Sequence, residues 1–439
     1  MRESGLTRAN QRNLPTSRRL GLGIMAVFGI VSLFAAACTS PAGSKAAGQA
    51  GAAAGSPSAS PPAQVTITPA NGTSNAKPNK GISIVATSGK ITNVSVTTGH
   101  QVVGGVLATD AKTWHTNWSL HNGAHYKVTV SAINADNKIT TTKSSFRTVA
   151  AGVTFSASTI VGLNQTYGVG MPITILFSSP VTRRAAVEKA IQVKTSKPVV
   201  GVWIWDSNES VSFRPQNYWP QHTKVSFTAH FNGLAISPGV YGTSNLSQSF
   251  RIGDSLIGVT STLTHKTRIF WKGKLHATWP DSSGMPGDDT SNGTYLTIEK
   301  GNPVLMSGPG YKNVPVFWSV RFTWSGDYYH SAPWSVGEQG FVNVSHGCVN
   351  LSPWNAQWYY ERAVPGDPIT ITGSPIAGQQ GDGYTEWFYT WKQLLNHSVT
   401  GMAVQTGPTG STLVDPSTVP AQTAATYLTG SKPHNFRAG

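Results

Sequence analysis

The sequence predicts a mainly β protein built from several domains, and three observations support this prediction. First, the chain has 439 residues, of which 39% are hydrophobic and 10% aromatic. That is enough for two to four domains of about 100–200 residues each. Second, only 12% of the residues are charged. Third, short apolar runs with period-two alternation are separated by Gly, Asn and Asp, a pattern typical of half-buried antiparallel strands. Together these features indicate an exported all-β protein.

Residues 1–37 predict a signal peptide. Arginines between positions 8 and 19 precede the uncharged stretch 20–37, which is the order expected of a targeting segment. The small residues that lead to Cys38 resemble the end of a bacterial lipoprotein signal, in which the cysteine is lipidated and becomes the new N-terminus. The alternative is an uncleaved transmembrane anchor, because the apolar run is near the ~20 residues that span a bilayer. Both interpretations place the remainder outside the cytoplasm.

Residues 38–64 predict a flexible linker. They consist mostly of Ala, Gly, Ser and Pro, and such a stretch cannot bury enough apolar surface to offset its ordering entropy. The formal net charge of the chain is +15, which suits an anionic cell envelope. The lysines and arginines are scattered rather than gathered into one patch, so we expect no nucleic-acid partner.

Two β-sandwich domains are predicted next, over residues 65–149 and 150–253. Strand-like runs lie at 65–69, 82–85, 91–96 and 126–132 in the first domain and at 173–177, 199–205 and 224–229 in the second. A short helix is expected over 184–191. Trp114 and Trp118 are expected in the core rather than in a ligand platform. Neither domain gathers His, Cys or carboxylates, so we interpret both as spacers.

A third domain is predicted over residues 254–374. It begins with a hairpin that turns at Lys272-Gly273, and a helix is expected over 353–362 with Ser352 as its N-cap. Further strands are expected at 292–298, 316–322 and 369–372. A Trp-rich extension and tail follows over 375–439. Its segment 387–395 is expected to form a helix or turn that docks on a neighbouring domain. After residue 399 we expect little regular structure apart from a short helix over 421–427. The last dozen residues are expected to be mobile.

The third domain holds the residues best suited to chemistry. Cys348 is the only cysteine besides Cys38, so the mature chain has no partner for a disulfide if Cys38 is acylated. A thiol needs a base to become a nucleophile at neutral pH. His330 and His346 are the two candidates.

The pattern around these residues resembles the catalytic domain of the L,D-transpeptidases, the YkuD-type fold. In that family a histidine precedes the sequence Ser/Thr-His-Gly-Cys, one further residue, and Asn or Arg; here His330 and the run 345–350 fill the pattern. The order of two sandwich domains, a catalytic domain and a Trp-rich tail resembles the mycobacterial-type lipoprotein enzymes of this family, so the sandwiches are expected to be Ig-like. The stretch between Met306 and Trp318, which corresponds to the active-site cap, is shorter than the family pattern.

The resemblance implies a 3→3 cross-linking reaction on peptidoglycan stem peptides. Cys348 would attack a donor tetrapeptide, release D-alanine and form a thioester, which an acceptor amine then resolves. His330 would be the base, Ser331 would orient it through its backbone carbonyl, and His346 and the backbone at Gly347 would assist the oxyanion. The substrate-binding residues implied are Tyr311, Trp334, Ser345 and Asn350. The resemblance also implies acylation of Cys348 by carbapenems.

Several alternatives stay open at this level. His346 either shapes the loop or assists the oxyanion, Tyr311 either packs under the cap or contacts substrate, and Trp334 is either a structural wall or a substrate contact. No zinc-like spacing of ligands is present, so no metal and no other cofactor is expected. The alternative functions are an L,D-carboxypeptidase that trims stems with water, and a non-catalytic wall-binding lipoprotein. Whether a sandwich domain contacts wall glycan is also open.

Overall fold

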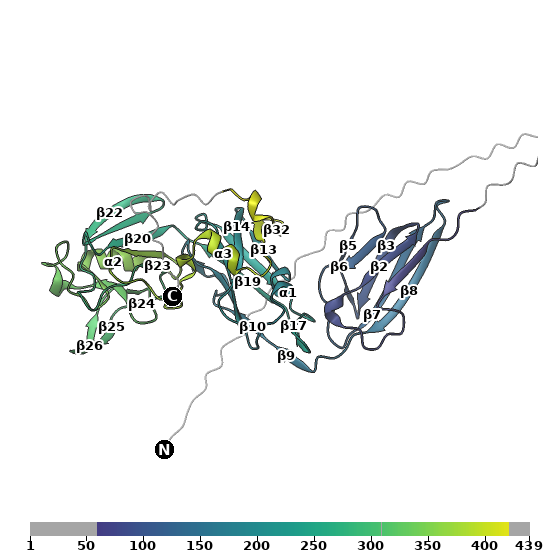
Figure 1. The fold of residues 1–439 in the computed structure, drawn as a ribbon, viewed down its shortest axis with the longest axis horizontal. Helices are drawn as coiled ribbons and strands as arrows, with labels where there is room; N and C mark the ends of the chain where they lie inside the picture. Colours follow the sequence, from purple (N-terminus) through teal and green to yellow (C-terminus); the bar gives the residue numbers. More distant parts are fainter. Residues whose placement is uncertain (1–58, 309, 421–439) are drawn as a thin grey trace, which may run out of the picture. The chain divides into compact units, whose positions relative to one another are not determined.

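The computed structural model describes residues 59–308 and 310–420, and the chain within these ranges is mainly β, as the sequence predicts (Figure 1). The predicted signal peptide, Cys38, most of the linker and the tail from residue 421 lie outside the described residues. No helix in the described ranges combines the length and the apolar character needed to cross a bilayer.

The first sandwich domain contains two sheets that bury alternate side chains against each other. Its elements are β1 (Gln64–Thr68), η1 (Pro78–Lys80), β2 (Ser83–Ser88), β3 (Lys90–Thr98), β4 (Gln101–Val102), β5 (Gly105–Leu107), β6 (Thr113–Thr116), β7 (His125–Ile133) and β8 (Ile139–Arg147). The strand orders are β1-β2-β6-β5 and β4-β3-β7-β8. Along β7, Tyr126, Val128 and Val130 are buried while the residues between them are more exposed. Trp114 lies in this core, as predicted.

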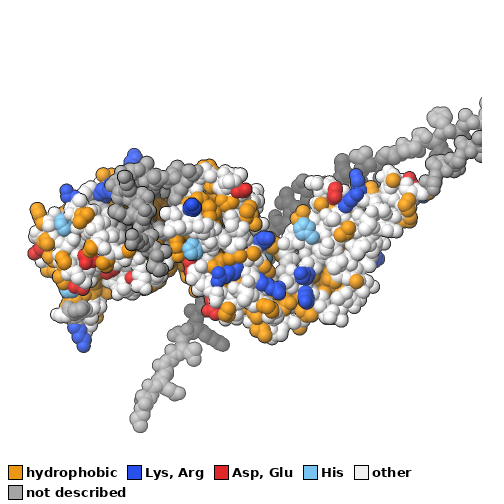
Figure 2. Space-filling model, in the orientation of Figure 1, with side chains coloured by type: hydrophobic (Ala, Val, Ile, Leu, Met, Phe, Trp, Pro, Cys, Tyr) orange, Lys and Arg blue, Asp and Glu red, His pale blue; other side chains and the backbone are white. Residues whose placement is uncertain are grey.

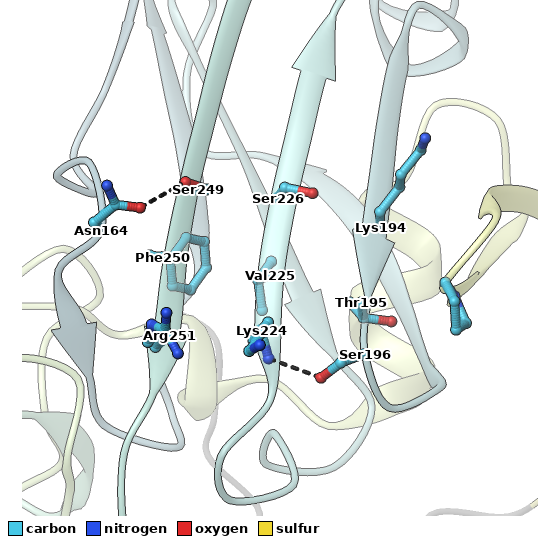
Figure 3. A pocket seen from close by; sticks show the side chains of 11 residues that line it. Asn164, Lys194, Thr195, Ser196, Lys224, Val225, Ser226, Ser249, Phe250 and Arg251 are labelled. Carbon is cyan, nitrogen blue, oxygen red and sulfur yellow. Dashed lines mark hydrogen bonds between the residues drawn. The ribbon is translucent and has the colours of Figure 1, made fainter. Parts of the chain in front are cut away.

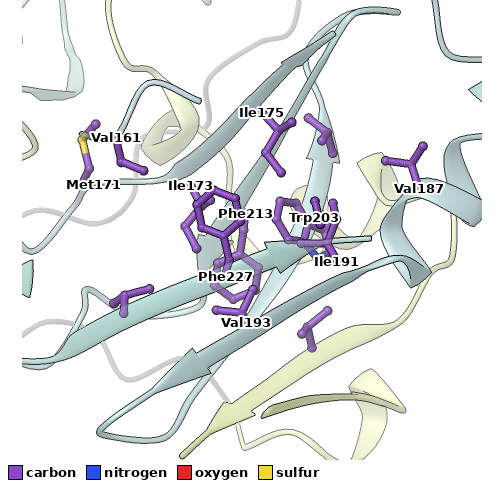
Figure 4. Packing of buried hydrophobic residues seen from close by; sticks show 14 of the residues in the cluster. Val161, Met171, Ile173, Ile175, Val187, Ile191, Val193, Trp203, Phe213 and Phe227 are labelled. Carbon is purple, nitrogen blue, oxygen red and sulfur yellow. The ribbon is translucent and has the colours of Figure 1, made fainter. Parts of the chain in front are cut away.

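The second sandwich domain has one large sheet and a small three-stranded one. Its elements are β9 (Val153–Phe155), β10 (Ala157–Thr159), β11 (Thr166–Tyr167), β12 (Ile173–Phe177), α1 (Arg184–Lys189), β13 (Ile191–Thr195), β14 (Val199–Trp205), β15 (Ser210–Pro215), β16 (Lys224–Ala229), β17 (Ala235–Ser237), β18 (Val240–Gly242) and β19 (Leu246–Ile252). Trp203, Phe213 and Phe227 are fully buried at its centre (Figure 4). The helix predicted over 184–191 is present but ends earlier, because β13 begins at Ile191.

The C-terminal extension completes the large sheet instead of forming a subdomain of its own. It contains η3 (Glu386–Phe388), α3 (Trp391–His397), β31 (Ala403–Gly407), β32 (Gly410–Val414) and η4 (Pro416–Thr418). The sheet order is β10-β12-β15-β14-β31-β13-β16-β19-β11, with β32 paired to β31. Leu394 of α3 is fully buried against Val202 and Ile204 of β14. The docking of residues 387–395 is confirmed. The expected loss of structure after residue 399 is wrong for residues 403–418, which form β31, β32 and η4.

The third domain holds the predicted active-site residues. Its elements are β20 (Leu256–Ser261), β21 (Lys266–Trp271), β22 (Lys274–Pro280), β23 (Gly293–Leu296), β24 (Glu299–Gly301), β25 (Val304–Gly308), β26 (Tyr311–Val316), β27 (Ser319–Arg321), β28 (Tyr328–Ser331), η2 (Pro333–Ser335), β29 (Val349–Leu351), α2 (Pro353–Arg362) and β30 (Pro368–Thr372). The sheets run β22-β21-β20-β30-β23 and β24-β27-β28-β29, and β25 and β26 form a separate hairpin.

Local sequence signals account for the β21–β22 hairpin and for the start of α2. The β21–β22 hairpin turns at Lys272 and Gly273, which both have positive φ, as a tight two-residue hairpin turn requires. The Ser352 side chain caps α2 by accepting from the Asn355 N–H, and Pro353 opens the helix. The single strand expected over 316–322 is interrupted, because Trp318 adopts a φ of 53° between β26 and β27.

Candidate active site

Two parallel strands position the candidate catalytic pair. In the β28–β29 ladder His330 lies opposite Asn350, and Cys348 directly precedes β29. Side chains two residues apart on a strand share a face, so Cys348, Asn350 and His330 are on the same face of this sheet. The opposite face is anchored in the core by Tyr329, Val349 and Leu351, all fully buried. Both reactive side chains are therefore held by a packed sheet.

The surroundings of Cys348 favour the protonated form of its thiol. Cys348 is the free cysteine of the described residues, and its Sγ donates to the Gly326 carbonyl oxygen at 3.7 Å. Burial raises the pKa of the thiol to about 12, with a further contribution from the Asp327 carboxylate, and a hydrogen bond from the Tyr328 backbone acts in the opposite direction. A thiolate forms here only when a base removes the proton.

His330 is a neutral imidazole with a hydrogen-bond partner at one of its two ring nitrogens. Its side chain is only 4% exposed, and this burial lowers its pKa to about 4. Nδ1 lies 3.1 Å from the Ser331 carbonyl oxygen, and a carbonyl only accepts, so Nδ1 bears the proton. Ser331 is itself fixed, because its N–H donates to the Phe317 carbonyl. Nε2 of the neutral ring is consequently left with its lone pair, ready to take a proton.

The loop before the cysteine is shaped by Ser345 and Gly347. The Ser345 hydroxyl donates to the Cys348 carbonyl and accepts from the Gly347 N–H at 3.3 Å. The Thr290 hydroxyl donates to the Gly347 carbonyl at 2.6 Å. The N–H of Gly347, one of the expected oxyanion donors, is therefore already engaged by Ser345.

The remaining predicted site residues lie around this loop. Tyr311, on the β25–β26 hairpin, has its ring centroid 5.3 Å from that of His346, and burial together with the nearby Cys348 raises its pKa. Trp334 is 59% exposed with its ring 6.1 Å from His330, so it is not a buried structural wall. Asn350 is buried and its Nδ2 donates to the Ser335 hydroxyl at 3.1 Å, which fastens η2 to β29.

Asp327 is a site residue that the sequence analysis does not include. Burial raises the pKa of its carboxyl to about 6, partly offset by a hydrogen bond with Thr323. Its charge acts on the thiol of Cys348, from which it is separated by 21 positions in the chain. The only sequence signal for it is its place three residues before His330.

Nothing in the described part of the chain forms a metal centre, since no three His, Cys, Asp or Glu side chains gather closely enough within residues 59–308 and 310–420. The arrangement instead combines a half-buried thiol, a neutral base of fixed tautomer and an ordered backbone loop. Such a set is suited to acyl transfer through a covalent intermediate.

Comparisons with known proteins agree with this chemistry. Residues 257–371 match the family model described as L,D-transpeptidase catalytic domain, and residues 73–235 match that of a bacterial Ig domain. L,D-transpeptidase 5 of Mycobacterium tuberculosis (strain ATCC 25618 / H37Rv) is 32% identical over 346 residues, covering 76% of this chain and 77% of the relative. L,D-transpeptidase 2 of M. tuberculosis (strain CDC 1551 / Oshkosh) is 30% identical over 342 residues, covering 75% of this chain and 83% of the relative.

Solved structures of similar proteins cover about half of this chain. A structure of LD transpeptidase LdtMt1 in complex with imipenem is 37% identical and covers 49% of this chain and 97% of its own, with a TM-score of 0.42. An L,D-transpeptidase from Mycobacterium smegmatis is 32% identical and covers 50% of this chain and 99% of its own, with a TM-score of 0.41.

Proposed function

Because this chain belongs to the L,D-transpeptidase family, we propose that it forms 3→3 cross-links in peptidoglycan through a thioester on Cys348. The donor is a tetrapeptide stem that loses its terminal D-alanine, and the acceptor is a side-chain amine on a neighbouring stem. The observation that carries the proposal is the neutral His330 ring, with its Nδ1 proton on the Ser331 carbonyl and its other nitrogen available on the face that bears Cys348.

In the first half-reaction His330 Nε2 takes the thiol proton as Cys348 Sγ attacks the carbonyl carbon of the third stem residue. The tetrahedral intermediate collapses, the bond to D-alanine breaks, and the proton passes from His330 to the departing amine. The new sulfur–carbon bond is the thioester. Because the thiol and the imidazole are both neutral at rest, the thiolate arises only as the carbonyl is attacked.

In the second half-reaction the acceptor amine attacks the thioester carbon and gives its proton to His330. Cys348 leaves as a thiolate and recovers that proton. We assign the backbone N–H of Cys348 as the oxyanion donor, because the Gly347 N–H is held by Ser345. Such a donor contributes about 3–4 kcal/mol of transition-state stabilisation.

Tyr311 and Trp334 are assigned to the walls of the substrate groove. Tyr311 lies on the cap hairpin near Cys348, and the exposed Trp334 lies beside His330. His346 is assigned to loop shape, because it is exposed and contacts Tyr311. Ser345 and Asn350 hold the loop through the hydrogen bonds described above.

Carbapenems are proposed as covalent inhibitors of the same cysteine. The relative LdtMt1 has been solved in complex with imipenem. Here Cys348 Sγ would attack the lactam carbonyl, the ring carbon–nitrogen bond would open, and the thiol proton would pass through His330 to the ring nitrogen. The neutral thiol and the fixed tautomer of His330 suit this reaction as they suit the natural one.

The test is mass spectrometry of products after incubation of the purified chain with a disaccharide-tetrapeptide, beside Cys348→Ala. A dimer that lacks one D-alanine, absent with the variant, supports the transpeptidase. Loss of D-alanine without a dimer would indicate an L,D-carboxypeptidase. Unchanged substrate with folded protein would indicate a non-catalytic wall-binding lipoprotein.

We also propose that the protein is lipid-anchored through Cys38 on the outer side of the cell membrane, facing the cell wall. The support is the order of arginines, apolar run and small residues before Cys38. Cys38→Ala should release the protein from the membrane fraction, and retention of the variant there would favour an uncleaved anchor.

A further inference from the structure

Positive charge is concentrated in the two sandwich domains. Residues 65–149 contain eight Lys and Arg against two Asp and Glu, and residues 150–253 contain eight against three. Residues 254–374, which hold Cys348, contain eight against nine. Blue Lys and Arg side chains outnumber red carboxylates over the second domain in Figure 2. Viewed by domain, the charge is therefore not evenly scattered, and the excess belongs to the domains without the nucleophile.

A shallow groove of about 380 Å³ crosses strands β13, β16 and β19 of the second domain. Figure 3 shows that its polar side chains stand in two rows across these strands. Lys194, Ser226 and Ser249 are register partners in one row, and Lys224 and Arg251 are partners in the other. The inward-facing Val225 and Phe250 are buried, whereas Pro408 is an exposed apolar residue of the lining. The charged side chains of the lining are all cationic.

Lys224 and Arg251 lie directly opposite each other without a counter-ion. Like charges at opposed positions on neighbouring strands are destabilising. Among the salt bridges of the described residues none includes Lys194, Lys224 or Arg251. The groove thus presents three uncompensated cations on a rigid sheet, at a cost to the stability of the domain.

The groups between these cations are hydroxyls and amides. Ser249 donates to Asn164 Oδ1 at 3.1 Å, and Ser196 accepts from the Lys224 N–H at 2.9 Å, so both serines are held in place. Ser226 lies between Lys194 and Ser249 in Figure 3. Cations pair with carboxylate or phosphate, and ordered hydroxyls and amides suit the hydroxyl and acetamido groups of sugars.

We propose that this groove binds an anionic polysaccharide, with Lys194, Lys224 and Arg251 pairing with its carboxylate or phosphate groups and the serines contacting its sugars. A membrane surface fits less well, because membrane-binding faces combine cations with several large exposed apolar side chains. In this lining Val225 and Phe250 are buried, and Pro408 is the one exposed apolar residue. This binding is separate from the chemistry of Cys348 and would hold the enzyme against its polymeric surroundings.

The test compares a triple variant of the groove with a charge-matched control, both made in the full chain carrying Cys348→Ala. The groove variant is Lys194→Gln, Lys224→Gln, Arg251→Gln. The control removes three exposed cations from the first domain, Lys127→Gln, Lys138→Gln, Lys143→Gln. Binding is measured at fixed ionic strength to polygalacturonate, to poly(glycerol phosphate), to neutral dextran and to phosphatidylglycerol vesicles.

The chain should bind at least one polyanion and not dextran, and the groove variant should bind at least about tenfold more weakly while the control changes less than about twofold. Preference for polygalacturonate identifies carboxylate as the anion, and preference for poly(glycerol phosphate) identifies phosphodiester. Equal losses in both variants, equal binding to dextran, or groove-dependent binding only to phosphatidylglycerol vesicles would each overturn the proposal.

Thermal unfolding gives an independent readout. The groove variant should be at least as stable as the parent, because the opposed pair of like charges is gone. A large fall in its melting temperature would show that these residues serve the fold, and would also overturn the proposal. Activity plays no part in either measurement, so failure of the cross-linking proposal and failure of this one are distinguishable.

Discussion

The carboxylate of Asp327 occupies the space that a side chain at Gly347 would need. A Cβ built on Gly347 would lie 2.5 Å from Asp327 Oδ1, closer than two such atoms can approach. The same carboxylate contributes to the raised pKa of Cys348, which follows Gly347 in the chain. Asp327 therefore constrains both the shape of the loop before Cys348 and the ionisation of the Cys348 thiol.

Asp327→Asn should make acylation of Cys348 by imipenem faster above pH 6. The carboxyl has a pKa of about 6, so it is charged at pH 8 and disfavours the thiolate, whereas at pH 5 it is neutral. Removing the charge is expected to lower the thiol pKa, which favours the thiolate, and to raise the acylation rate at pH 8 by up to about tenfold. Intact-mass measurements between pH 5 and pH 9 would follow this, and a rate ratio that does not vary with pH would contradict it.

Gly347→Ala should reduce both stability and activity. Its φ of +116° is unfavourable for a side chain, and the new methyl group would meet Asp327. We expect a loss of about 1–3 kcal/mol in the free energy of unfolding. Gly337→Ala is the matched control, because nothing lies within 4 Å of its Cβ position. If chemical denaturation gave the same small effect for both variants, the crowding at Gly347 would be disproved.

His330→Gln should slow acylation by about 10²–10⁴-fold, the usual contribution of a general base. His346→Gln serves as the control, since this exposed histidine also flanks Cys348 and is assigned to loop shape. It should change the rate by less than about tenfold. In the parent, activity should persist as pH falls until the His330 pKa of about 4, where the base becomes protonated. Stopped-flow measurements of acylation would give the rates of the two variants and the pH profile of the parent. Equal losses of rate in the two variants would show that His330 is not the specific base.

Leu394→Ala should destabilise the second sandwich domain by about 2–4 kcal/mol, because it leaves a cavity against Val202 and Ile204. Leu413→Ala, at a side chain that is 40% exposed, should change stability by less than about 0.5 kcal/mol. Calorimetry of both variants measures the difference. Similar melting temperatures would mean that α3 is dispensable for the domain.

Local signals in the sequence predict the elements that depend on neighbours in the chain. The Lys272-Gly273 turn and the Ser352 cap require a particular backbone geometry and are found as expected. The pairing of His330 with Cys348 follows from a family resemblance rather than from periodicity. The proximity of Asp327 to the thiol is invisible in the sequence, because it depends on how β28 and β29 align.

Strands β31 and β32 were missed for a similar reason. Their residues 403–414 include Gly407, Gly410 and several small polar side chains, so their intrinsic strand preference is weak. They become strands because β13 and β14 leave backbone groups that need partners, and Val200 pairs with Gln405 there. The break at Trp318 is likewise a tertiary effect within an apolar run.

The position of β31 between β13 and β14 also sets the order in which the protein can fold. Residues 403–407 are synthesised more than 190 positions after β14, and the whole third domain lies between them. When the ribosome has made the second domain up to Ile252, its large sheet still lacks a central strand. The edges of β13 and β14 therefore stay unpaired until the end of the chain has been synthesised. A nascent or proteolytically shortened product that stops after β30 would expose these edges to aggregation or degradation.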